Sequence, residues 1–304
     1  MKLLLATRSS ALALWQAHEV AQQVTERTGH TTALLELKAS ADLDTSTPLE
    51  RFGRTALFTA EVDRAVLDGR AHAGVHSLKD ATTTLEPGLA LVAVLPRGPI
   101  EDVLVTRDGR DLASLRQGAR VATGSLRRAA MLRRERPDLD LVPLRGNVAT
   151  RLARLEDNEL DGLLMARAAL VRLGLTERPH AVLDPDRFVP AVSQGIVGIV
   201  ARETDAESHA AFAAIGDGET LCAATAERAL LRELRGGCNV PAGALARIDG
   251  DAITLHAVVL SPDGTRCVEG VRRGSTDRAA ELGKELALEL LAGGAADLLA
   301  LARP

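Results

Sequence analysis

Aromatic residues are almost absent from this sequence, which has no tyrosine, one tryptophan and four phenylalanines among 304 residues. Proteins that bind single-stranded nucleic acid commonly stack bases on aromatic side chains, and such stacking platforms are missing here. The formal net charge of −4 also argues against general binding to nucleic acid or to an acidic membrane surface. We therefore expect a small-molecule partner, with no nucleic acid and no membrane.

Cysteine is scarce as well, with only Cys222, Cys238 and Cys267. Their spacings of 16 and 29 residues give neither a metal-ligand pattern nor a disulfide framework, which predicts no metal site and a reducing compartment. No stretch reaches the roughly 18 apolar residues of a membrane span. The apolar start Met1–Ala6 is broken by Thr7–Ser10, too soon for the apolar core of a signal peptide. We predict a cytoplasmic protein.

Catalytic signatures of several common classes are also missing. The sequence has no Ser-His-Asp order, no phosphate-binding P-loop and no glycine-rich dinucleotide fingerprint. It has four lysines against 33 arginines. We attribute most of that excess to genome composition, so the position of an arginine is informative and the total is not.

Alternating strand and helix patterns fill the first two thirds of the chain, which predicts α/β domains with largely parallel sheets. Strands are expected at Lys2–Thr7, Thr32–Lys38, Ala71–Ser77, Leu89–Leu95, Asp102–Arg107, Arg120–Thr123, Leu139–Arg145 and Asp161–Ala166. Helices are expected from Ser9 or Ser10 to Thr28, and at Thr59–Leu67, Leu126–Arg136, Val148–Asn158 and Arg167–Leu173.

The last third of the chain changes character. A helix at Glu219–Leu234 is followed by hairpin signals at Asp249-Gly250 and Pro262–Gly264, and a helix from Thr276 closes the chain. The breaker Pro96–Pro99 is a plausible crossover between domains, and the apolar segment Val189–Ala201 could return to the first. We predict two α/β domains, 1–96 plus 194–216 and 100–190, and a small α+β domain, 218–304, with a three-stranded antiparallel sheet.

Arginines are concentrated between residues 107 and 154, where twelve arginines and five acidic residues give a local net charge of +7. Ser125–Arg128 opens a helix after a strand, and Arg145-Gly146-Asn147 joins a strand to the next helix, with Arg151 one turn further on. Helix N-termini at strand ends bind anions, and guanidinium groups match carboxylates with two hydrogen bonds. A ligand with several carboxylates or phosphates is indicated. For Arg133, Arg134 and Arg136 a solvated basic face is the better interpretation.

Two further segments carry polar chemistry. His76–Asp80 ends a strand, and a carboxylate there could stabilise a developing cation or carry a proton, although a surface Lys79–Asp80 pair is an equally simple interpretation. Arg235–Pro241 places the thiol of Cys238 on a turn after two glycines, and the proline prevents the helix from resuming. That geometry suits a covalent attachment point, although a lone cysteine is more often a small buried hydrophobe.

Six segments of the chain resemble the porphobilinogen deaminase (hydroxymethylbilane synthase) family, in the family's order. They are Ala6–Ala17 (ATRSSALALWQA), His76–Asp80 (HSLKD), Gly124–Arg128 (GSLRR), Leu144–Asn147 (LRGN), Pro190–Gly195 (PAVSQG) and Gly236–Cys238 (GGC). The resemblance implies a monomer with two α/β domains like those of periplasmic binding proteins. It implies a dipyrromethane cofactor, thioether-linked to Cys238, onto which four porphobilinogen units are condensed with loss of ammonia. Hydrolysis then releases the linear tetrapyrrole.

The resemblance also assigns roles to single residues. Asp80 matches the aspartate that faces the pyrrole nitrogens and stabilises the cationic azafulvene. Residues matching the cofactor site are Cys238, Lys79, Ser77, Ser125, Arg127, Arg128, Asp80, Thr123 and Gly146. Residues matching the substrate site are Arg8, Ser10, Arg145, Arg151 and Gln194.

The chain departs from the family pattern in three places, Ala39–Asp42, Thr55–Phe58 and Ala81-Thr82. The first two lie in or near the loop that covers the family's active site, so a relative with impaired elongation is one alternative. A non-catalytic, two-lobed binding protein for a polyanionic small molecule is another. An acyl transferase with a cysteine nucleophile is a third, but it would need a histidine base, and the nearest, His256, lies in a strand pattern.

Overall fold

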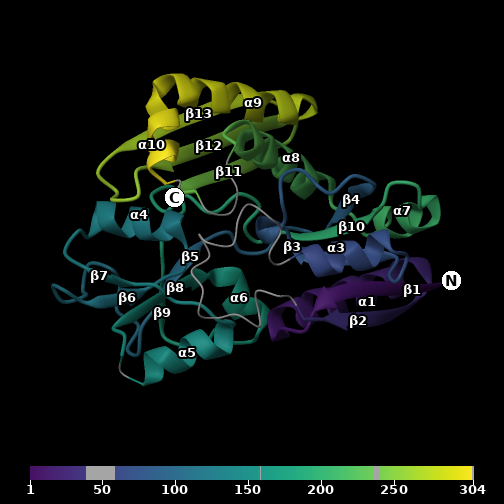
Figure 1. Cartoon of the computed structure of the whole chain (residues 1–304), viewed down its shortest axis with the longest axis horizontal. Helices are drawn as coiled ribbons and strands as arrows, with labels where there is room; N and C mark the ends of the chain where they lie inside the picture. The colour runs from purple at the N-terminus through teal and green to yellow at the C-terminus, as the bar shows by residue number, and fades with distance from the viewer. Residues whose placement is uncertain (39–58, 158, 236–239, 303–304) are drawn as a thin grey trace. The chain divides into compact units, whose positions relative to one another are not determined.

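The computed structural model describes residues 1–38, 59–157, 159–235 and 240–302. The chain forms two compact units, Met1–Gly98 with Gly195–Ala224, and Pro99–Gln194 with Thr225–Pro304 (Figure 1). The first unit contains one five-stranded sheet, and the second contains a five-stranded and a three-stranded sheet. Two five-stranded sheets in α/β arrangements, followed by an antiparallel three-stranded sheet, confirm the predicted fold class. The limits of the three separate domains stay a prediction.

The sheet of the first unit has the order β2-β1-β3-β10-β4. Its strands are β1 (Lys2–Arg8), β2 (Thr31–Leu37), β3 (Ala73–Ser77), β4 (Leu89–Val94) and β10 (Val197–Arg202). The pairs β1–β2 and β1–β3 are parallel, whereas β10 runs antiparallel to both β3 and β4. The apolar segment that was expected to return to the first domain therefore does so as β10.

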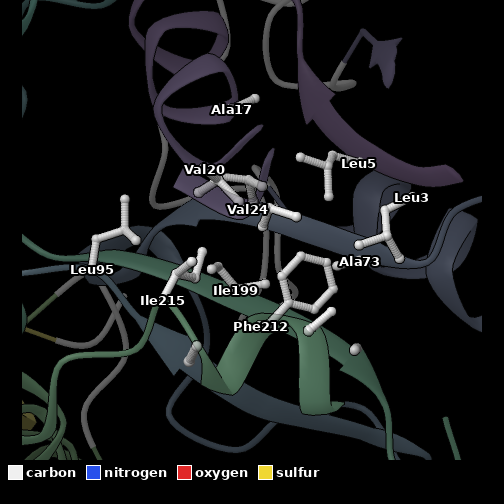
Figure 2. Packing of buried hydrophobic residues seen from close by; sticks show 14 of the residues in the cluster. Leu3, Leu5, Ala17, Val20, Val24, Ala73, Leu95, Ile199, Phe212 and Ile215 are labelled. Carbon is white, nitrogen blue, oxygen red and sulfur yellow. The ribbon is translucent and has the colours of Figure 1, made fainter. Parts of the chain in front are cut away.

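Helices cover both faces of this sheet, because successive strand residues point to opposite sides. Leu3 and Leu5 pack against α1 (Ala11–Thr28) and against α7 (Ala206–Ala213), which contributes Phe212 (Figure 2). Ala6, the residue after Leu5, points to the other face of the sheet and packs against α3 (Ala60–Leu67). Ser10 caps α1 and Gly29 ends it in a left-handed conformation, as the sequence predicted.

The second five-stranded sheet has the order β7-β6-β8-β5-β9. Its strands are β5 (Asp102–Val105), β6 (Arg120–Ala122), β7 (Asp140–Val142), β8 (Gly162–Ala166) and β9 (His180–Val182). Two pairings are again parallel and two antiparallel, with β5 in the place that β10 has in the first sheet. The prediction of largely parallel sheets is thus only half correct. Strands β5 and β10 each follow a connection from one unit to the other, and not a helix that returns the chain to the same sheet in a parallel direction.

The third sheet shares a hydrophobic core with the second. It consists of β11 (Ala242–Asp249), β12 (Ala252–Leu260) and β13 (Cys267–Ser275), all antiparallel. Leu245, Val258 and Leu260 from this sheet pack with α4 (Leu126–Glu135) and with the apolar face of β5 and β8. The opposite face of the second sheet is covered by α5 (Val148–Glu156) and α6 (Arg167–Arg172). One continuous core explains why these two sheets form a single compact unit.

Three helices complete the described chain, α8 (Gly218–Glu233), α9 (Ala279–Leu290) and α10 (Ala296–Leu301). Helix α9 packs on the third sheet, where Gly270 and Gly274 leave room for its leucines (Figure 1). Strand β9 and helix α7 were not predicted, since a three-residue strand is too short to show a period and α7 has a weak apolar stripe. Within the described ranges, no helix has the length and apolar character needed to cross a membrane.

Candidate functional site

Asp80 lies at the end of the buried strand β3, on the 3₁₀ turn Leu78–Asp80. Leu78 anchors this turn, since its side chain is 1% exposed and its N–H donates to the Ile196 carbonyl at 3.0 Å. Gly198 makes room beneath it, because a Cβ there would lie 2.8 Å from Leu78 Cδ1. The backbone of the turn is therefore fixed, while the side chains of Lys79 and Asp80 remain half-buried.

The other predicted residues of the first unit lie on β1, α1 and β3. Ser77 exchanges hydrogen bonds with the buried Gln16 of α1, at 2.8 Å from Gln16 Nε2 and 3.2 Å from its Oε1. Ser10 Oγ accepts from the N–H of Ala13 at 3.4 Å, so this hydroxyl caps α1. Arg8 is the half-buried last residue of β1. Arg8, Ser10 and Ser77 thus lie at the ends of a strand or a helix. A rigid strand or helix holds such a side chain in a defined position.

His76 has a structural environment. Its Nε2 lies 3.0 Å from Asp63 Oδ1, although the two atoms do not have the alignment of a hydrogen bond. Both side chains are buried, and the pair joins β3 to α3. The interpretation of His76 as a structural residue fits this position better than a role at the site.

Arg127 and Arg128 are buried, with exposures of 3% and 7%, and both bind the carboxylate of Asp102 at the start of β5. Arg127 Nη2 lies 2.7 Å from Oδ2, and Arg128 Nε and Nη2 lie 3.0 and 2.7 Å from Oδ1. Burial alone would raise the pKa of the Asp102 carboxyl, but the two guanidinium charges hold it well below its usual range. Burial lowers the pKa of Arg127, yet a guanidinium remains charged at neutral pH.

Gln194 joins the same cluster. Its Nε2 donates to Asp102 Oδ1 at 2.9 Å and to the Ile100 carbonyl at 2.7 Å, and the side chain is fully buried. The preceding Ser193 has a left-handed backbone, with φ 62°. Its N–H donates to Glu227 Oε2 at 2.6 Å, while Glu227 Oε1 accepts from Ala246 N–H at 2.8 Å. Glu227, on α8, thereby ties this segment to β11.

The turn after β6 packs against the turn after β7. A Cβ on Gly124 would lie 2.6 Å from the Leu144 carbonyl oxygen, so only glycine permits this approach. Thr123 Oγ1 accepts from the N–H of Ser125 at 3.2 Å, and Ser125 Oγ lies 3.4 Å from the N–H of Arg128 as the cap of α4.

Past Leu144, the second turn leads into α5. Gly146 has φ 108°, and its carbonyl accepts from Arg151 Nε at 2.8 Å. Asn147 caps α5, and Arg145 is half-buried between β7 and this cap. The two arginine-bearing motifs of the sequence are thus adjacent at the ends of β6 and β7, where the N-termini of α4 and α5 favour anions.

The predicted site residues fall into two groups. Arg8, Ser10, Ser77, Lys79 and Asp80 belong to the first unit. The second unit holds Thr123, Ser125, Arg127, Arg128, Arg145, Gly146, Arg151 and Gln194. Cys238, with its neighbours from 236 to 239, lies outside the described residues, as do the divergent stretches Ala39–Asp42 and Thr55–Phe58.

Three residues with evident supporting roles were not predicted: Gln16, Asp102 and Glu227. Asp102 opens an apolar strand and Glu227 lies in an alanine-rich helix. An acidic residue inside an otherwise buried pattern was the available signal, because a buried charge requires a partner.

The chain is similar to known proteins in sequence and in fold. The family model described as "Porphobilinogen deaminase, dipyromethane cofactor binding domain" matches residues 3–210, and the model of the porphobilinogen deaminase C-terminal domain matches residues 221–292. The porphobilinogen deaminase of Bordetella parapertussis is 43% identical over 300 residues, covering 98% of this chain and 96% of that protein. That of Roseiflexus castenholzii is 44% identical over 299 residues, covering 98% of both chains. Among solved structures, the methionine-binding protein MetQ matches with a TM-score of 0.46 and 14% identity, covering 70% of this chain and 88% of its own.

Each unit contains a five-stranded sheet covered by helices, and the described candidate residues lie at or near the ends of its strands or the starts of its helices. The chain belongs to the porphobilinogen deaminase family. It is therefore an enzyme of the transferase class, and its residues 3–210 match the dipyrromethane cofactor-binding domain of that family.

Proposed function

We propose that this chain condenses four porphobilinogen units, one after another, onto a dipyrromethane linked through a thioether to Cys238. Ammonia leaves at each step, and hydrolysis of the last bond releases the linear tetrapyrrole used in porphyrin and haem biosynthesis. The observation that carries the proposal is Asp80, a carboxylate held on a fixed turn at the end of a buried strand, in a chain of this family.

The second unit suits the acetate and propionate groups of pyrroles. Arg127 and Arg128 bring two positive charges to the single carboxylate of Asp102, so one positive charge remains without a counter-charge in the cluster. Arg127 Nε is also buried without a hydrogen-bond partner within the described structure. An acidic ligand fits such a site, because a buried charge is stabilised only by an opposite one. When bound, the cofactor supplies the pyrrole carbon to which the first substrate unit is joined.

Asp80 would act on the substrate. As ammonia departs, positive charge develops on the substrate ring, and a fixed carboxylate stabilises that charge without having to reorganise. The same carboxylate can then accept the proton that the coupled ring must lose. Lys79 and Ser77 lie beside it at the end of the same strand and would hold the cofactor. Thr123, Ser125, Arg127, Arg128 and Gly146 would hold it as well.

Arg8, Ser10, Arg145, Arg151 and Gln194 would bind the incoming substrate. Arg145 and Arg151 stand at the entry to α5, where two guanidinium groups and the helix N-terminus favour a carboxylate. Ser10 also caps α1, and Gln194 is buried. We also propose that the protein is a monomer and that it works in the cytoplasm. The free thiol that the cofactor linkage requires at Cys238 persists in a reducing compartment.

Two experiments test the proposal. The purified protein should be heavier than its sequence by two condensed pyrrole units, and Cys238→Ser should lose the added mass while Cys222→Ser and Cys267→Ser retain it. An unmodified parent from a host that makes porphobilinogen would refute the cofactor assignment.

Asp80→Asn removes the charge and keeps the shape. We expect porphobilinogen consumption to fall by about 10²–10⁴-fold in protein that still carries its cofactor by mass. A surface Asp–Lys pair would cost well under about 1 kcal/mol in stability and nothing in rate. Activity within a few-fold of the parent would remove Asp80 from the mechanism.

A further inference from the structure

A pocket lies in the second unit, between the second half of α4 and the face of the third sheet opposite α9. Its volume is about 280 Å³. The apolar part of its lining consists of Met131 from α4, Val258 and Leu260 from β12, and Cys267 from β13. None of these four residues has a role in the proposed function, so the pocket is a separate feature of the molecule.

The walls of the pocket are held in place by contacts within the protein. The hairpin turn between β12 and β13 packs directly on α4, because a Cβ on Gly264 would lie 2.4 Å from the Ala130 carbonyl oxygen. Arg133 Nη1 also donates to the carbonyl of Pro262, in the same turn, at 2.7 Å. A pocket with walls fixed in this way is largely formed before a ligand arrives, as is usual for small-molecule sites.

The acidic groups around the pocket all have partners within the protein. The pairs are Glu135–Arg187, Asp186–Arg247 and Glu269–His256. Arg134, in the last turn of α4, differs from them. Its exposed guanidinium makes no hydrogen bond or ion pair with any other residue that the structure describes. A cation is therefore available to a ligand at this rim.

The charge of Arg134 acts on the pocket itself. Burial raises the pKa of the half-buried Cys267 thiol, and the positive charge of Arg134 offsets part of that rise. The guanidinium therefore lies close to the apolar lining. Glu269 acts on the same thiol in the opposite direction, so a ligand with more than one negative charge would be repelled.

We propose that this pocket binds a small amphipathic monocarboxylic acid, with its apolar body against Met131, Val258 and Leu260 and its carboxylate on Arg134. Pockets for drug-sized ligands have volumes of roughly 300–1,000 Å³, so this one suits a single ring or a short apolar chain. A guanidinium group matches a carboxylate with two parallel hydrogen bonds. The proposal gives a binding role to an arginine that the sequence analysis assigned to a solvated basic face.

The test uses the three methionines of the chain as reporters. The purified protein, with its cofactor in place, is labelled with ¹³C at the methionine methyl groups and titrated with 4-phenylbutanoate. Met131 lines the pocket, whereas Met165 lies in the core on the other face of the second sheet and Met1 is exposed. We expect the Met131 signal to shift and the other two to stay, with a dissociation constant on the order of 1 mM for so small a ligand.

Two further probes test the class of ligand. 4-Phenylbutanamide keeps the apolar body without the charge, and acetate keeps the charge without the body, so both should bind more weakly than 4-phenylbutanoate. Arg134→Leu should weaken the binding of 4-phenylbutanoate by about 3- to 5-fold, because an exposed ion pair contributes modestly, and should leave that of the amide unchanged. The matched control is Arg154→Leu, an exposed arginine in the last turn of α5, which should bind the acid like the parent.

Cysteine alkylation locates the site by a second method. Saturating 4-phenylbutanoate should slow the reaction of Cys267 with N-ethylmaleimide, followed by peptide mass. The reaction of Cys222, a half-buried thiol of α8, should keep its rate.

Three results would overturn the proposal. The first is a Met131 signal that does not move at about 10 mM probe. The second is an amide that binds as tightly as the acid. The third is Arg134→Leu protein that binds the acid like the parent, which would place the probe at the start of α4, where Arg127 contacts Met131. All three are read without porphobilinogen, so they are distinguishable from a failure of the proposed function.

Discussion

Replacing Glu227 by glutamine should weaken the second unit through two backbone hydrogen bonds. Its carboxylate is fully buried and accepts from Ser193 N–H at 2.6 Å and from Ala246 N–H at 2.8 Å. Glutamine has one oxygen acceptor, so its NH₂ group would face the N–H of one of these residues. The change keeps the size of the side chain and alters only its hydrogen-bonding capacity.

The expected loss follows from these contacts. A hydrogen bond to a charged group contributes about 1.5–3 kcal/mol, and an unsatisfied buried donor costs about 1–3 kcal/mol. Glutamine no longer has to bury a charge, which offsets part of the loss. We therefore expect the free energy of unfolding to fall by about 2–4 kcal/mol. For a unit of this size that lowers the melting temperature by roughly 5–15 °C.

The assay is thermal unfolding by calorimetry, with Glu233→Gln as the control. Glu233 lies in the last turn of the same helix, where a negative charge is unfavourable, so its replacement should be neutral or slightly stabilising. If Glu227→Gln melts within about 1 °C of the parent, the two backbone bonds do not tie the Ser193 segment to β11, and the reasoning fails.

Two other predictions concern the same unit. The pKa of Asp102 in the folded protein lies below its value in the unfolded chain, which is near 4. The stabilisation that the ionised carboxylate provides is therefore complete above about pH 4 and is lost as the pH falls further. Acid unfolding, followed by circular dichroism, should be less steep below about pH 4 in Asp102→Asn than in the parent. Gly264 has φ 75°, and a Cβ there would lie 2.4 Å from the Ala130 carbonyl oxygen. Gly264→Ala should therefore lower the free energy of unfolding, measured by urea titration, by about 2 kcal/mol or more. The control Gly250→Ala, at φ 57° with open space around it, should lower it by less.

Much of the fold could be predicted because its signals are local. The cap at Ser10, the stop at Gly29 and the turns at Asp249-Gly250 and Pro262–Gly264 depend on residues a few positions apart, and the structure contains all of them. The antiparallel strand within each five-stranded sheet could not be predicted in this way. The sequence of β10 is apolar on both faces, which suits a central strand of either direction.

The stretch after Asp80 shows how a departure from the family pattern is accommodated. Ala81 is buried at 6% exposure with Leu78, Val94 and Ile196, and its backbone is extended, with φ −82° and ψ 142°. Thr82 follows, and its Oγ1 donates to the Thr84 carbonyl at 2.6 Å. This side-chain hydrogen bond shapes the turn after Asp80.

The arginine-rich segment shows why the site itself was harder to predict than the fold. Its local charge of +7 does not show which of the guanidinium groups are available to a ligand. In the structure Arg107 binds the carbonyls of Leu155 and Leu160, and Arg136 binds Asp138 and the carbonyl of Leu112, so these side chains brace loops. A count of charges cannot distinguish such arginines from Arg128, because the distinction depends on acceptors far away in sequence. What separates Arg128 is the position of Asp102, 26 residues earlier, and only the pairing of β5 with β8 in the middle of the sheet brings that carboxylate under the start of α4.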